Sequence, residues 1–347
     1  MTKHASLHGS GQIVVEADWS MEGGIGQAES LTNEAAQFAS MTAQYEKGCE
    51  AAGHGFDNVP VTAVFGDLAY MMALAYGCEM KLQGDLVVAV PRYGEGSDLS
   101  PISAPTNIAE RGLYPLTLER IARFQERWPH IPLTICDNQS PIDVVTSLIH
   151  SEAAMLLLYD EPERMFEILD GVTDSIIRIN RVFEKTIKNF GGFQSSHYLP
   201  KGMHVSDDTA AYLSPDLYAR FASPYNRRLA EEFGGIRFHC CMNHDFNLKN
   251  FSDTPGFEGF DAMPDYNALD KVLDAIRGKG IWHIYNYGFA KKANRPETDE
   301  ETFYRLMDAT NGVCGMRITV YHPIKEEALR LADKVKNRAV SLGRSEG

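Results

Sequence analysis

The chain of 347 residues lacks any run of about 18 apolar residues, the length that a membrane-spanning helix requires. Its first residues, MTKHASLHGSGQ, contain no apolar stretch of the signal-peptide type. We therefore expect a cytoplasmic protein without a membrane partner. Clusters of lysine and arginine are absent too, and the net charge is −14. Because phosphate binding needs a basic surface, nucleic acid is not expected as a partner.

A disulfide framework is also missing from the pattern of cysteines. Six cysteines are present, but their spacing is irregular, and Cys240 and Cys241 are adjacent. In a chain of this length without a secretion signal, reduced thiols are expected. Such cysteines are more often buried, metal-binding or catalytic.

No glycine-rich phosphate-binding fingerprint follows an early strand, since Gly94-Glu95-Gly96 lacks the rest of that pattern. This argues against the alternative of a doubly wound open sheet. Instead, short β-branched or aromatic runs alternate with amphipathic segments, which predicts an α/β fold, a (β/α)₈ TIM barrel. The predicted strands are Val59–Phe65, Leu86–Val90, Leu133–Cys136, His204–Ser206, Ile236–Cys240, Gly259–Ala262, Ile281–Tyr285 and Val313–Val320.

The helical segments have clear boundaries. The longest apolar stripe begins after Pro162 and ends at Gly191-Gly192, with apolar residues three or four apart. Another helix begins at Ser214-Pro215, and Pro224 is expected to kink or divide it. Residues 27–53 are also predicted to be helical, whereas residues 1–20 show no periodicity. We predict an N-terminal arm and helical extension over residues 1–54 and a barrel over 55–347.

Functional residues of such a barrel lie at the carboxyl ends of its strands. The strand beginning at residue 236 ends in His239-Cys240-Cys241, and the spacing of two places His239 and Cys241 on one face. An imidazole and a thiolate suit zinc, although paired cysteines in a strand also occur as plain core. Cys314, at the last strand, is expected to reach the mouth as a third ligand and leave an open catalytic position. Cys240 and His244 remain alternative ligands.

Polar residues after three other strands are candidates for catalysis or substrate binding. Asp207 and Asp208 follow the fourth strand, where Asp208 is the preferred residue to orient a substrate or to hydrogen-bond the zinc histidine. The alternative is a solvated loop or a cap for the next helix. The substrate-binding candidates end the third and seventh strands and are Asn138, Gln139, Tyr285 and Asn286.

The metal-site candidates also resemble a known motif. His239-x-Cys241, followed by Cys314, resembles the His-x-Cys…Cys zinc motif of the methylcobamide:coenzyme M methyltransferases in the uroporphyrinogen decarboxylase superfamily. The resemblance covers roughly residues 55–342, although Met242 stands where the family often has glycine. The other similar segments are Val59-Pro60-Val61 with Phe65-Gly66, Tyr76-Gly77-Cys78-Glu79, Gln139-Ser140-Pro141-Ile142-Asp143, Asp207 to Tyr225, and Gly312-Val313-Cys314-Gly315.

This resemblance implies a zinc-dependent methyltransferase that uses a corrinoid carried on a separate corrinoid-binding protein. Zn²⁺ held by His239, Cys241 and Cys314 would activate a small thiol, whose free pKa is about 8.5, or another small methyl donor or acceptor. The direction of transfer and the small molecule are left open. One alternative is a uroporphyrinogen decarboxylase-like enzyme, but no arginine precedes Arg92 to bind a substrate with eight carboxylates. Another is a non-catalytic barrel that binds a small ligand.

Overall fold

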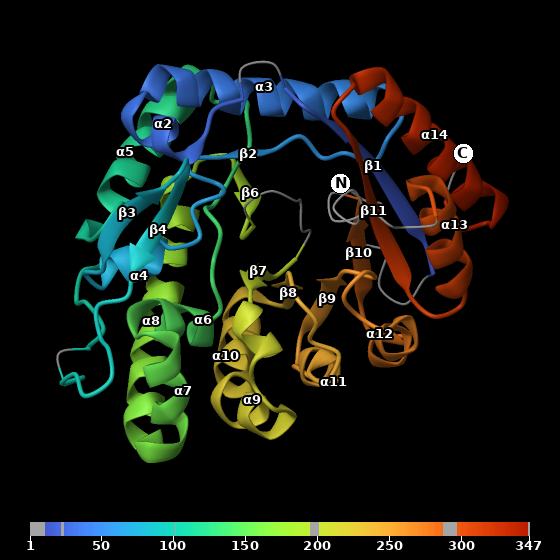
Figure 1. The fold of residues 1–347 in the computed structure, drawn as a ribbon. Coiled ribbons are helices and arrows are strands. Elements are labelled where there is room, and N and C mark those ends of the chain that lie inside the picture. Colours follow the sequence, from blue (N-terminus) through green and yellow to red (C-terminus); the bar gives the residue numbers. More distant parts are fainter. Residues whose placement is uncertain (1–10, 22–23, 101, 195–200, 287–296, 346–347) are drawn as a thin grey trace.

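The computed structural model describes residues 11–21, 24–100, 102–194, 201–286 and 297–345. Two parallel sheets form its centre (Figure 1). One has six strands in the order β1 (Ile13–Trp19), β11 (Gly315–His322), β10 (Ile281–Tyr285), β9 (Phe257–Ala262), β8 (Ile236–Cys240) and β7 (Met203–Ser206). The other has the order β2 (Thr62–Ala63), β5 (Leu133–Thr134) and β6 (Phe190–Gly192).

Short links join the two sheets on both sides. Parallel bridges connect Gln139 with Ser206 and Phe193 with Met203, so residues beyond β5 and β6 contact β7. On the other side, β1 hydrogen-bonds to Asp57, which leads into β2. The sheets therefore surround a common interior, and the fold is of the predicted (β/α)₈ TIM-barrel class.

Helices surround the strands (Figure 1). They are α2 (Gln27–Thr32), α3 (Glu34–Gly53), α4 (Met71–Ala75), α5 (Tyr114–Arg127), α6 (Pro141–Leu148), α7 (Ser151–Asp160), α8 (Pro162–Thr186), α9 (Pro215–Phe221), α10 (Ser223–Phe233), α11 (Leu248–Ser252), α12 (Leu269–Ile276), α13 (Asp299–Ala309) and α14 (Lys325–Ser341), with 3₁₀ turns η1 (Ile108–Glu110) and η2 (Asp208–Ala211). None of the helices in the described ranges is both long and apolar enough to cross a membrane.

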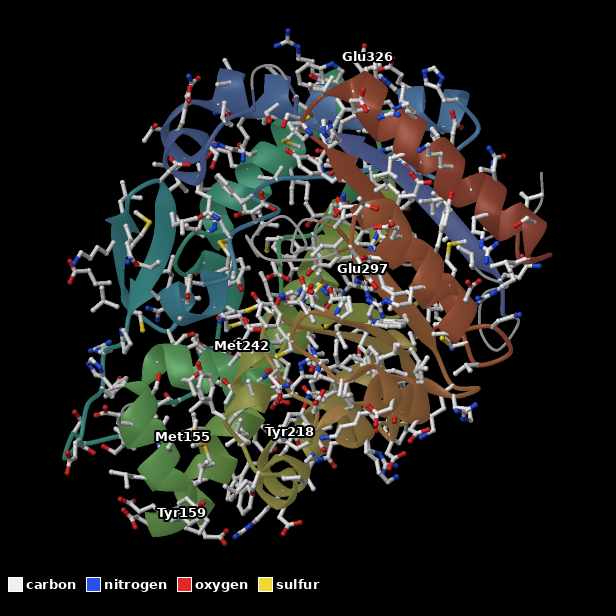
Figure 2. All side chains as sticks on the ribbon, turned by 45° about the vertical axis from the view of Figure 1, so that its right-hand side comes forward. Met155, Tyr159, Tyr218, Met242, Glu297 and Glu326 are labelled. Atoms are coloured by element: carbon white, nitrogen blue, oxygen red, sulfur yellow. The ribbon has the colours of Figure 1, made fainter. Side chains whose placement is uncertain are left out.

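The starts of α8 and α9 follow the sequence signals, whereas α8 ends at Thr186, before the predicted end at Gly191-Gly192. The Ser214 side chain accepts a hydrogen bond from the Leu217 backbone N–H and caps α9. The chain breaks at Ala222 and continues as α10, which is where Pro224 predicts a division. Figure 2 shows how the side chains cover the helical ring, with Tyr159 exposed on α7 and Glu326 at the start of α14.

Three strand predictions need correction. The predicted strand Leu86–Val90 is β4, which pairs antiparallel with β3 (Glu79–Gln83) in a separate hairpin. The barrel instead uses β6, a three-residue strand with two glycines, and β1, which pairs in parallel with β11. The expected loose N-terminal arm is therefore wrong for Ile13–Trp19. Glu16 and Asp18 alternate with Val15, Ala17 and Trp19, which is the period-two pattern of a strand with one polar face and which the prediction overlooked.

Polar side chains line the barrel interior, where branched apolar residues are usual. Along β8, Arg237 and His239 take part in polar contacts inside the barrel, while Phe238 packs against Phe251 of α11. The same alternation of period two recurs in β7, β10, β11 and β1. The interior residues of these strands are Glu16, Asp18, His204, Ser206, Arg237, His239, His283, Tyr285, Arg317 and Thr319.

Candidate functional site

The barrel interior contains a cavity with a volume of about 470 Å³. Strands β1, β7, β8, β9, β10 and β11 contribute lining residues, and α3 adds Gln44 and Lys47. The segments after β2 and β5 contribute Asp67 and Asp137. This volume lies within the range of about 300–1,000 Å³ that is typical of sites for small molecules.

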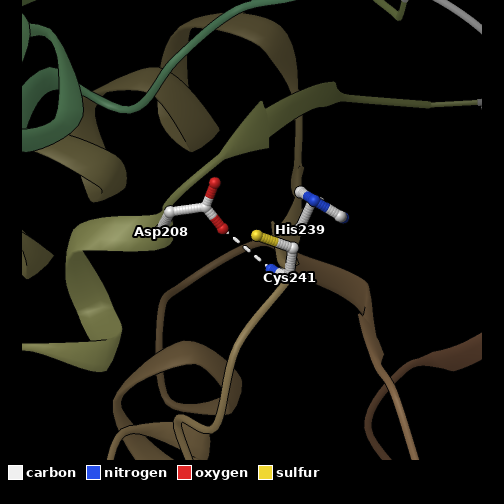
Figure 3. Close-up of side chains that lie close together, drawn as sticks. All are labelled: Asp208, His239 and Cys241. Atoms are coloured by element: carbon white, nitrogen blue, oxygen red, sulfur yellow. Dashed lines mark hydrogen bonds between the residues drawn. The ribbon is translucent and has the colours of Figure 1, made fainter. Parts of the chain in front are cut away.

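Three potential metal ligands meet where β7 and β8 end (Figure 3). The ligand atoms of Asp208, His239 and Cys241 all lie within 4.8 Å of one another. The parallel pairing of Ser206 with His239 brings the two strand ends together, and Asp208 begins η2 directly beyond. The Cys241 backbone N–H donates to Asp208 Oδ1 at 2.8 Å, which fixes the carboxylate beside the thiol.

The His239 ring is held by a buried carboxylate on the neighbouring strand. Its Nδ1 lies 2.9 and 3.0 Å from the two oxygens of Asp261, which is 3% exposed. Burial opposes a charged imidazole, but the Asp261 carboxylate outweighs it, so the pKa of His239 is raised well above its ordinary value. Because Nδ1 is used in this contact, Nε2 is the nitrogen left to bind a metal, as in carboxylate–histidine–metal arrangements.

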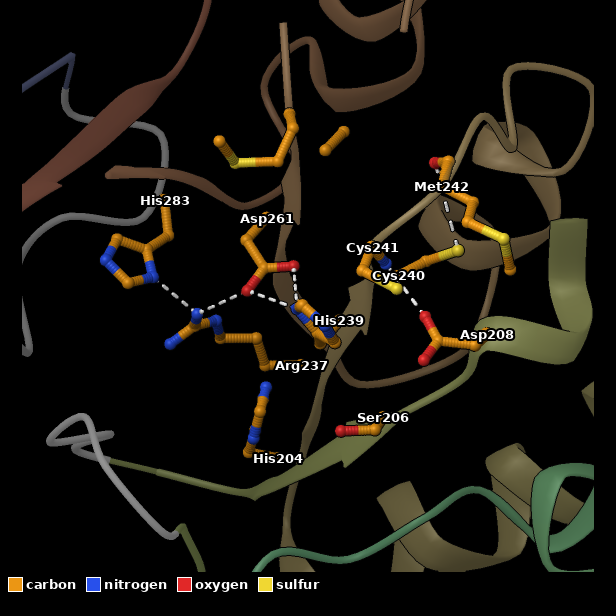
Figure 4. Close-up of polar contacts among 12 residues, drawn as sticks. His204, Ser206, Asp208, Arg237, His239, Cys240, Cys241, Met242, Asp261 and His283 are labelled. Atoms are coloured by element: carbon orange, nitrogen blue, oxygen red, sulfur yellow. Dashed lines mark hydrogen bonds and ion pairs between the residues drawn. The ribbon is translucent and has the colours of Figure 1, made fainter. Parts of the chain in front are cut away.

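Asp261 is itself fixed by a second buried contact (Figure 4). Arg237 Nη2 lies 3.3 Å from Asp261 Oδ2 and 2.5 Å from Nδ1 of His283. Burial alone would raise the pKa of Asp261, but the adjacent His239 and Arg237 lower it, and the carboxylate stays ionised. Asp261 therefore acts as a charged, immobile support for the His239 ring.

The same set of contacts continues to the first strand. His283 Nε2 lies 2.9 Å from Thr319 Oγ1, and Thr319 in turn donates to Glu16 at 3.1 Å. Arg317 donates to both oxygens of Glu16, at 2.7 and 2.9 Å. Polar contacts thus run without interruption from the end of β8 to β1, and they satisfy groups that would otherwise be costly to bury.

Cys314 does not join the group, which corrects the predicted set of ligands. It precedes Gly315, the first residue of β11, and Gly315 pairs with Ile281, the first residue of β10. Parallel strands place these starts together at the amino end of the barrel, opposite the mouth. The Cys314 carbonyl accepts a hydrogen bond from Arg344 at 2.8 Å, and burial raises the pKa of the thiol to about 12. Asp208 takes the third position in its stead.

The two alternative ligands also lie apart from the trio. Cys240 is 1% exposed, and its thiol is directed to the Met242 carbonyl. His244 is fully buried, with Nδ1 at 2.8 Å from the same carbonyl and its ring beside Phe251. Among the residues that the structure describes, the trio is the one group of this kind.

Asp207, predicted as a catalytic residue, belongs to the packing behind the strand. It is fully buried, accepts a hydrogen bond from Asn226 at 2.9 Å and another from the Tyr218 hydroxyl. Burial raises its pKa to about 6. Because both partners belong to α9 and α10, the carboxyl faces away from the cavity, and Asp208 alone reaches the site.

The two candidates that end β10 and follow it have different roles. Tyr285 lines the cavity, and its role in binding a substrate stays a prediction. Asn286 does not line it, and its Nδ2 donates to Asp299 at 2.6 Å and to the Tyr321 carbonyl at 2.8 Å. Asn286 therefore ties the ends of β10 and β11 to α13, which corrects its prediction as a substrate contact.

The two candidates after β5 also have structural partners. Asn138 Oδ1 accepts a hydrogen bond from Asn180 of α8 at 2.9 Å, and Gln139 is paired with Ser147 of α6 at 3.3 Å. Neither lines the cavity, whereas the preceding Asp137 does. The prediction identified the correct strand end but missed the residue whose side chain points inward.

Sequence reasoning also missed Asp137, His204 and Asp261 as residues of the site. Each lies inside or directly after a predicted apolar run, where a charged or titratable side chain costs free energy unless it has a role. The alternation in His204-Val205-Ser206 was the available signal, since a polar residue at every second position marks the other face of a strand.

Comparisons with known proteins agree with this fold. A family model described as uroporphyrinogen decarboxylase (URO-D) matches residues 27–279. A solved methyltransferase from Methanosarcina mazei has 16% identity and a TM-score of 0.68, over 95% of this chain and 94% of that one. A β-methylaspartase from Clostridium tetanomorphum reaches a TM-score of only 0.37 at 12% identity, over 68% of this chain and 50% of that one. No curated protein matches the chain.

Proposed function

Since the chain belongs to the uroporphyrinogen decarboxylase family, we propose that it works in that family's methyltransferase chemistry. It would move a methyl group between a corrinoid, carried on a partner protein, and a small molecule bound in the cavity. The observation that carries the proposal is the trio of Asp208, His239 and Cys241 at the mouth of the barrel. The overall likeness to a methyltransferase from Methanosarcina mazei supports it.

The trio fits a catalytic zinc ion. Imidazole, thiolate and carboxylate are the protein ligands of Zn²⁺, and three of them leave a position for a substrate. Asp261 orients His239 for this role, and exposed Cys241 leaves the group accessible. A bound zinc ion would hold a coordinated thiol as thiolate at neutral pH, and the corrinoid would supply or accept the methyl group.

The cavity is poorly suited to the family's other substrate, a tetrapyrrole with eight carboxylates. Five carboxylates line it, from Glu16, Asp18, Asp67, Asp137 and Asp261. Its lining cations, Lys47 and Arg317, are already paired with Asp18 and Glu16. A polyanion would be repelled here, because both described cations of the lining already have a carboxylate partner.

Metal analysis tests the site directly. We expect one zinc per chain in wild type, loss of zinc in Cys241→Ala and retention of zinc in Cys314→Ser, because Cys314 lies at the other end of the barrel. The ion content would be measured by mass spectrometry and the fold by circular dichroism. A folded wild-type protein without bindable zinc would refute the site, as would equal zinc loss in both variants.

The methyl-transfer step has its own test. The zinc-loaded protein is mixed with methylcobalamin and a panel of small thiols, and demethylation of the corrinoid is followed by its visible spectrum. We expect turnover with at least one thiol, lost in Cys241→Ala and kept in Cys314→Ser. Zinc-loaded wild type that demethylates with none of these partners, and methylates cob(I)alamin from no methylated donor, would contradict methyl transfer.

A further inference from the structure

The charges in the cavity do not balance. Three of its five carboxylates have a cation of their own, and the pairs are Glu16 with Arg317, Asp18 with Lys47, and Asp261 with Arg237. The remaining carboxylates, Asp67 and Asp137, form no ion pair with a lysine or arginine of the described chain. Two carboxylates in a partly enclosed space thus have no lysine or arginine partner among the described residues.

These two carboxylates lie on one wall of the cavity. The Asp137 backbone N–H donates to the Gly66 carbonyl at 3.0 Å, which places Asp137 beside the segment that carries Asp67. Oδ2 of Asp137 accepts a hydrogen bond from Ser206 at 3.0 Å, whereas Oδ1 has no hydrogen-bond partner and is buried. A buried acceptor without a donor is rare in folded proteins and points to a missing partner.

His204 belongs to the same wall and carries a second polar atom without a hydrogen-bond partner. His204 is 9% exposed and lines the cavity, with Nδ1 at 3.8 Å from Oδ1 of Asp137 and Nε2 without a hydrogen-bond partner. A neutral imidazole offers one nitrogen as an acceptor.

We propose that the wall formed by Asp67, Asp137 and His204 binds the ammonium group of the small-molecule substrate. This inference rests on the proposed function, because it concerns the molecule whose reacting end lies at Cys241. An ammonium group carries several N–H donors, no acceptor and one positive charge. It can donate hydrogen bonds to the carboxylates of Asp67 and Asp137 and to Nε2 of His204, and its charge attracts both carboxylates. A carboxylate or sulfonate at this position would be repelled.

The electrostatic surroundings of Asp67 and Asp137 also favour a cationic ligand. Burial raises the pKa of Asp67 and that of Asp137, since ionised carboxylates are poorly solvated there. A cation bound between them would offset this cost. The ring of Tyr285 also lines the cavity, and an aromatic face attracts ammonium ions.

The wall lies close to the candidate metal centre. The ring centroids of His204 and His239 are 6.3 Å apart, and both rings line the one cavity. A short aliphatic molecule can therefore place a thiol or methyl group at the trio and an ammonium group at Asp137. The proposed substrate class is a small aliphatic amine with its reactive atom a few bonds from the nitrogen.

Three thiols that share a two-carbon chain and differ in the charge of their terminal group test the inference. Cysteamine is cationic, 2-mercaptoethanol neutral and 2-mercaptoethanesulfonate anionic, and each is titrated into cobalt(II)-substituted protein while the visible spectrum is followed. We expect cysteamine to bind about tenfold more tightly than the neutral thiol, a difference of about 1.4 kcal/mol, and the anionic thiol to bind most weakly. In Asp137→Asn, cysteamine should lose this advantage while the neutral thiol keeps its affinity.

A matched control is Asp253→Asn, which removes a surface carboxylate paired with Lys249 and Lys279. It should leave all three affinities unchanged. Affinities that do not follow charge, or an Asp137→Asn variant that weakens all three thiols equally, would overturn the ammonium wall and leave the metal site standing.

A cobalt spectrum that responds to no thiol would instead contradict the proposed function. The wall is then judged without metal, by thermal unfolding of metal-free protein in ethylammonium chloride and in sodium chloride of equal ionic strength. We expect ethylammonium to raise the Tm of wild type and not that of Asp137→Asn. Equal Tm values for wild type in the two salts would overturn the inference.

Discussion

Neighbouring residues at the end of β7 have opposite surroundings. Asp207 faces the helices, while Asp208 lies beside Cys241. His239 and Cys241 could be predicted because their spacing of two fixes a common face. Among Asp137, Asn138 and Gln139, the sequence could not predict which side chain faces the cavity. The face on which each side chain lies depends on how β5 pairs with β2 and β6.

A pair of isosteric variants tests this division of roles. Asp208→Asn should lower zinc affinity by about tenfold or more, because a carboxylate ligand becomes a neutral amide. Asp207→Asn should bind zinc like wild type, since the Asp207 side chain accepts hydrogen bonds from Tyr218 and Asn226 on the helices and does not belong to the trio. Competition with a chromophoric chelator measures both affinities, and equal weakening in the two variants would contradict the assignment.

The buried Asp207 also predicts a pH dependence of stability. Its pKa is raised to about 6, above the unfolded value of about 3.9, so the folded state holds the proton more tightly. The free energy of unfolding should therefore fall as pH rises from about 4 to 6, by at most about 3 kcal/mol from this group. Urea unfolding of metal-free wild type against Asp207→Asn isolates this contribution. A difference between them that is independent of pH would show that Asp207 titrates normally.

At the element scale, long and strongly periodic segments were predictable and short strands were not. The apolar stripe of α8 predicted that this helix begins at Pro162, and Ser214 predicted where α9 begins. Residues Phe190–Gly192 carry two glycines, so their place in the barrel depends on pairing with β5 rather than on local preference. The apolar run Leu86–Val90 is a true strand, but its partner is the local β3, which a pattern of residues cannot reveal.

Strand β9 offers a sharp test of packing between elements. Gly259 has φ +153°, and a Cβ there would lie 2.2 Å from the Ile281 carbonyl oxygen of β10. Gly259→Ala should destabilise the fold by about 3 kcal/mol or more, since backbone must move in the strand that carries Asp261. Gly278→Ala is the control: φ is +68° but the space is open, so only about 1 kcal/mol is expected. Equal losses in urea unfolding would contradict the proposed clash.

On the scale of the whole molecule, the two ends of the chain form one buried contact. Glu16 of β1 and Arg317 of β11 are 4% and 6% exposed, and they join the first and last strands of the barrel (Figure 1). The class of fold could be predicted from the alternation of strands and helices. The pairing of β1 with β11 could not be predicted in this way, because it joins segments some 300 residues apart.

Removing one partner of that pair should be costly. Glu16→Gln removes the carboxylate that pairs with the buried Arg317 guanidinium, and we expect a loss of about 3–5 kcal/mol in the free energy of unfolding. The control Glu300→Gln breaks a surface pair with Lys334 and should cost less than about 1 kcal/mol. Chemical denaturation measures both. A Glu16→Gln variant as stable as Glu300→Gln would show that the closure contributes little.

The position of β1 has a consequence for synthesis of the protein. Among the strands that the structure describes, β1 is the first to be synthesised and its partner β11 is the last. Until then, Ile13–Trp19 remains an unpaired strand with a mostly apolar outer face, able to pair wrongly with other chains. The barrel therefore cannot close before β11 has been synthesised, and we expect this last pairing step to be slow. Nascent chains stalled before residue 315 should fail to fold and should remain bound to chaperones.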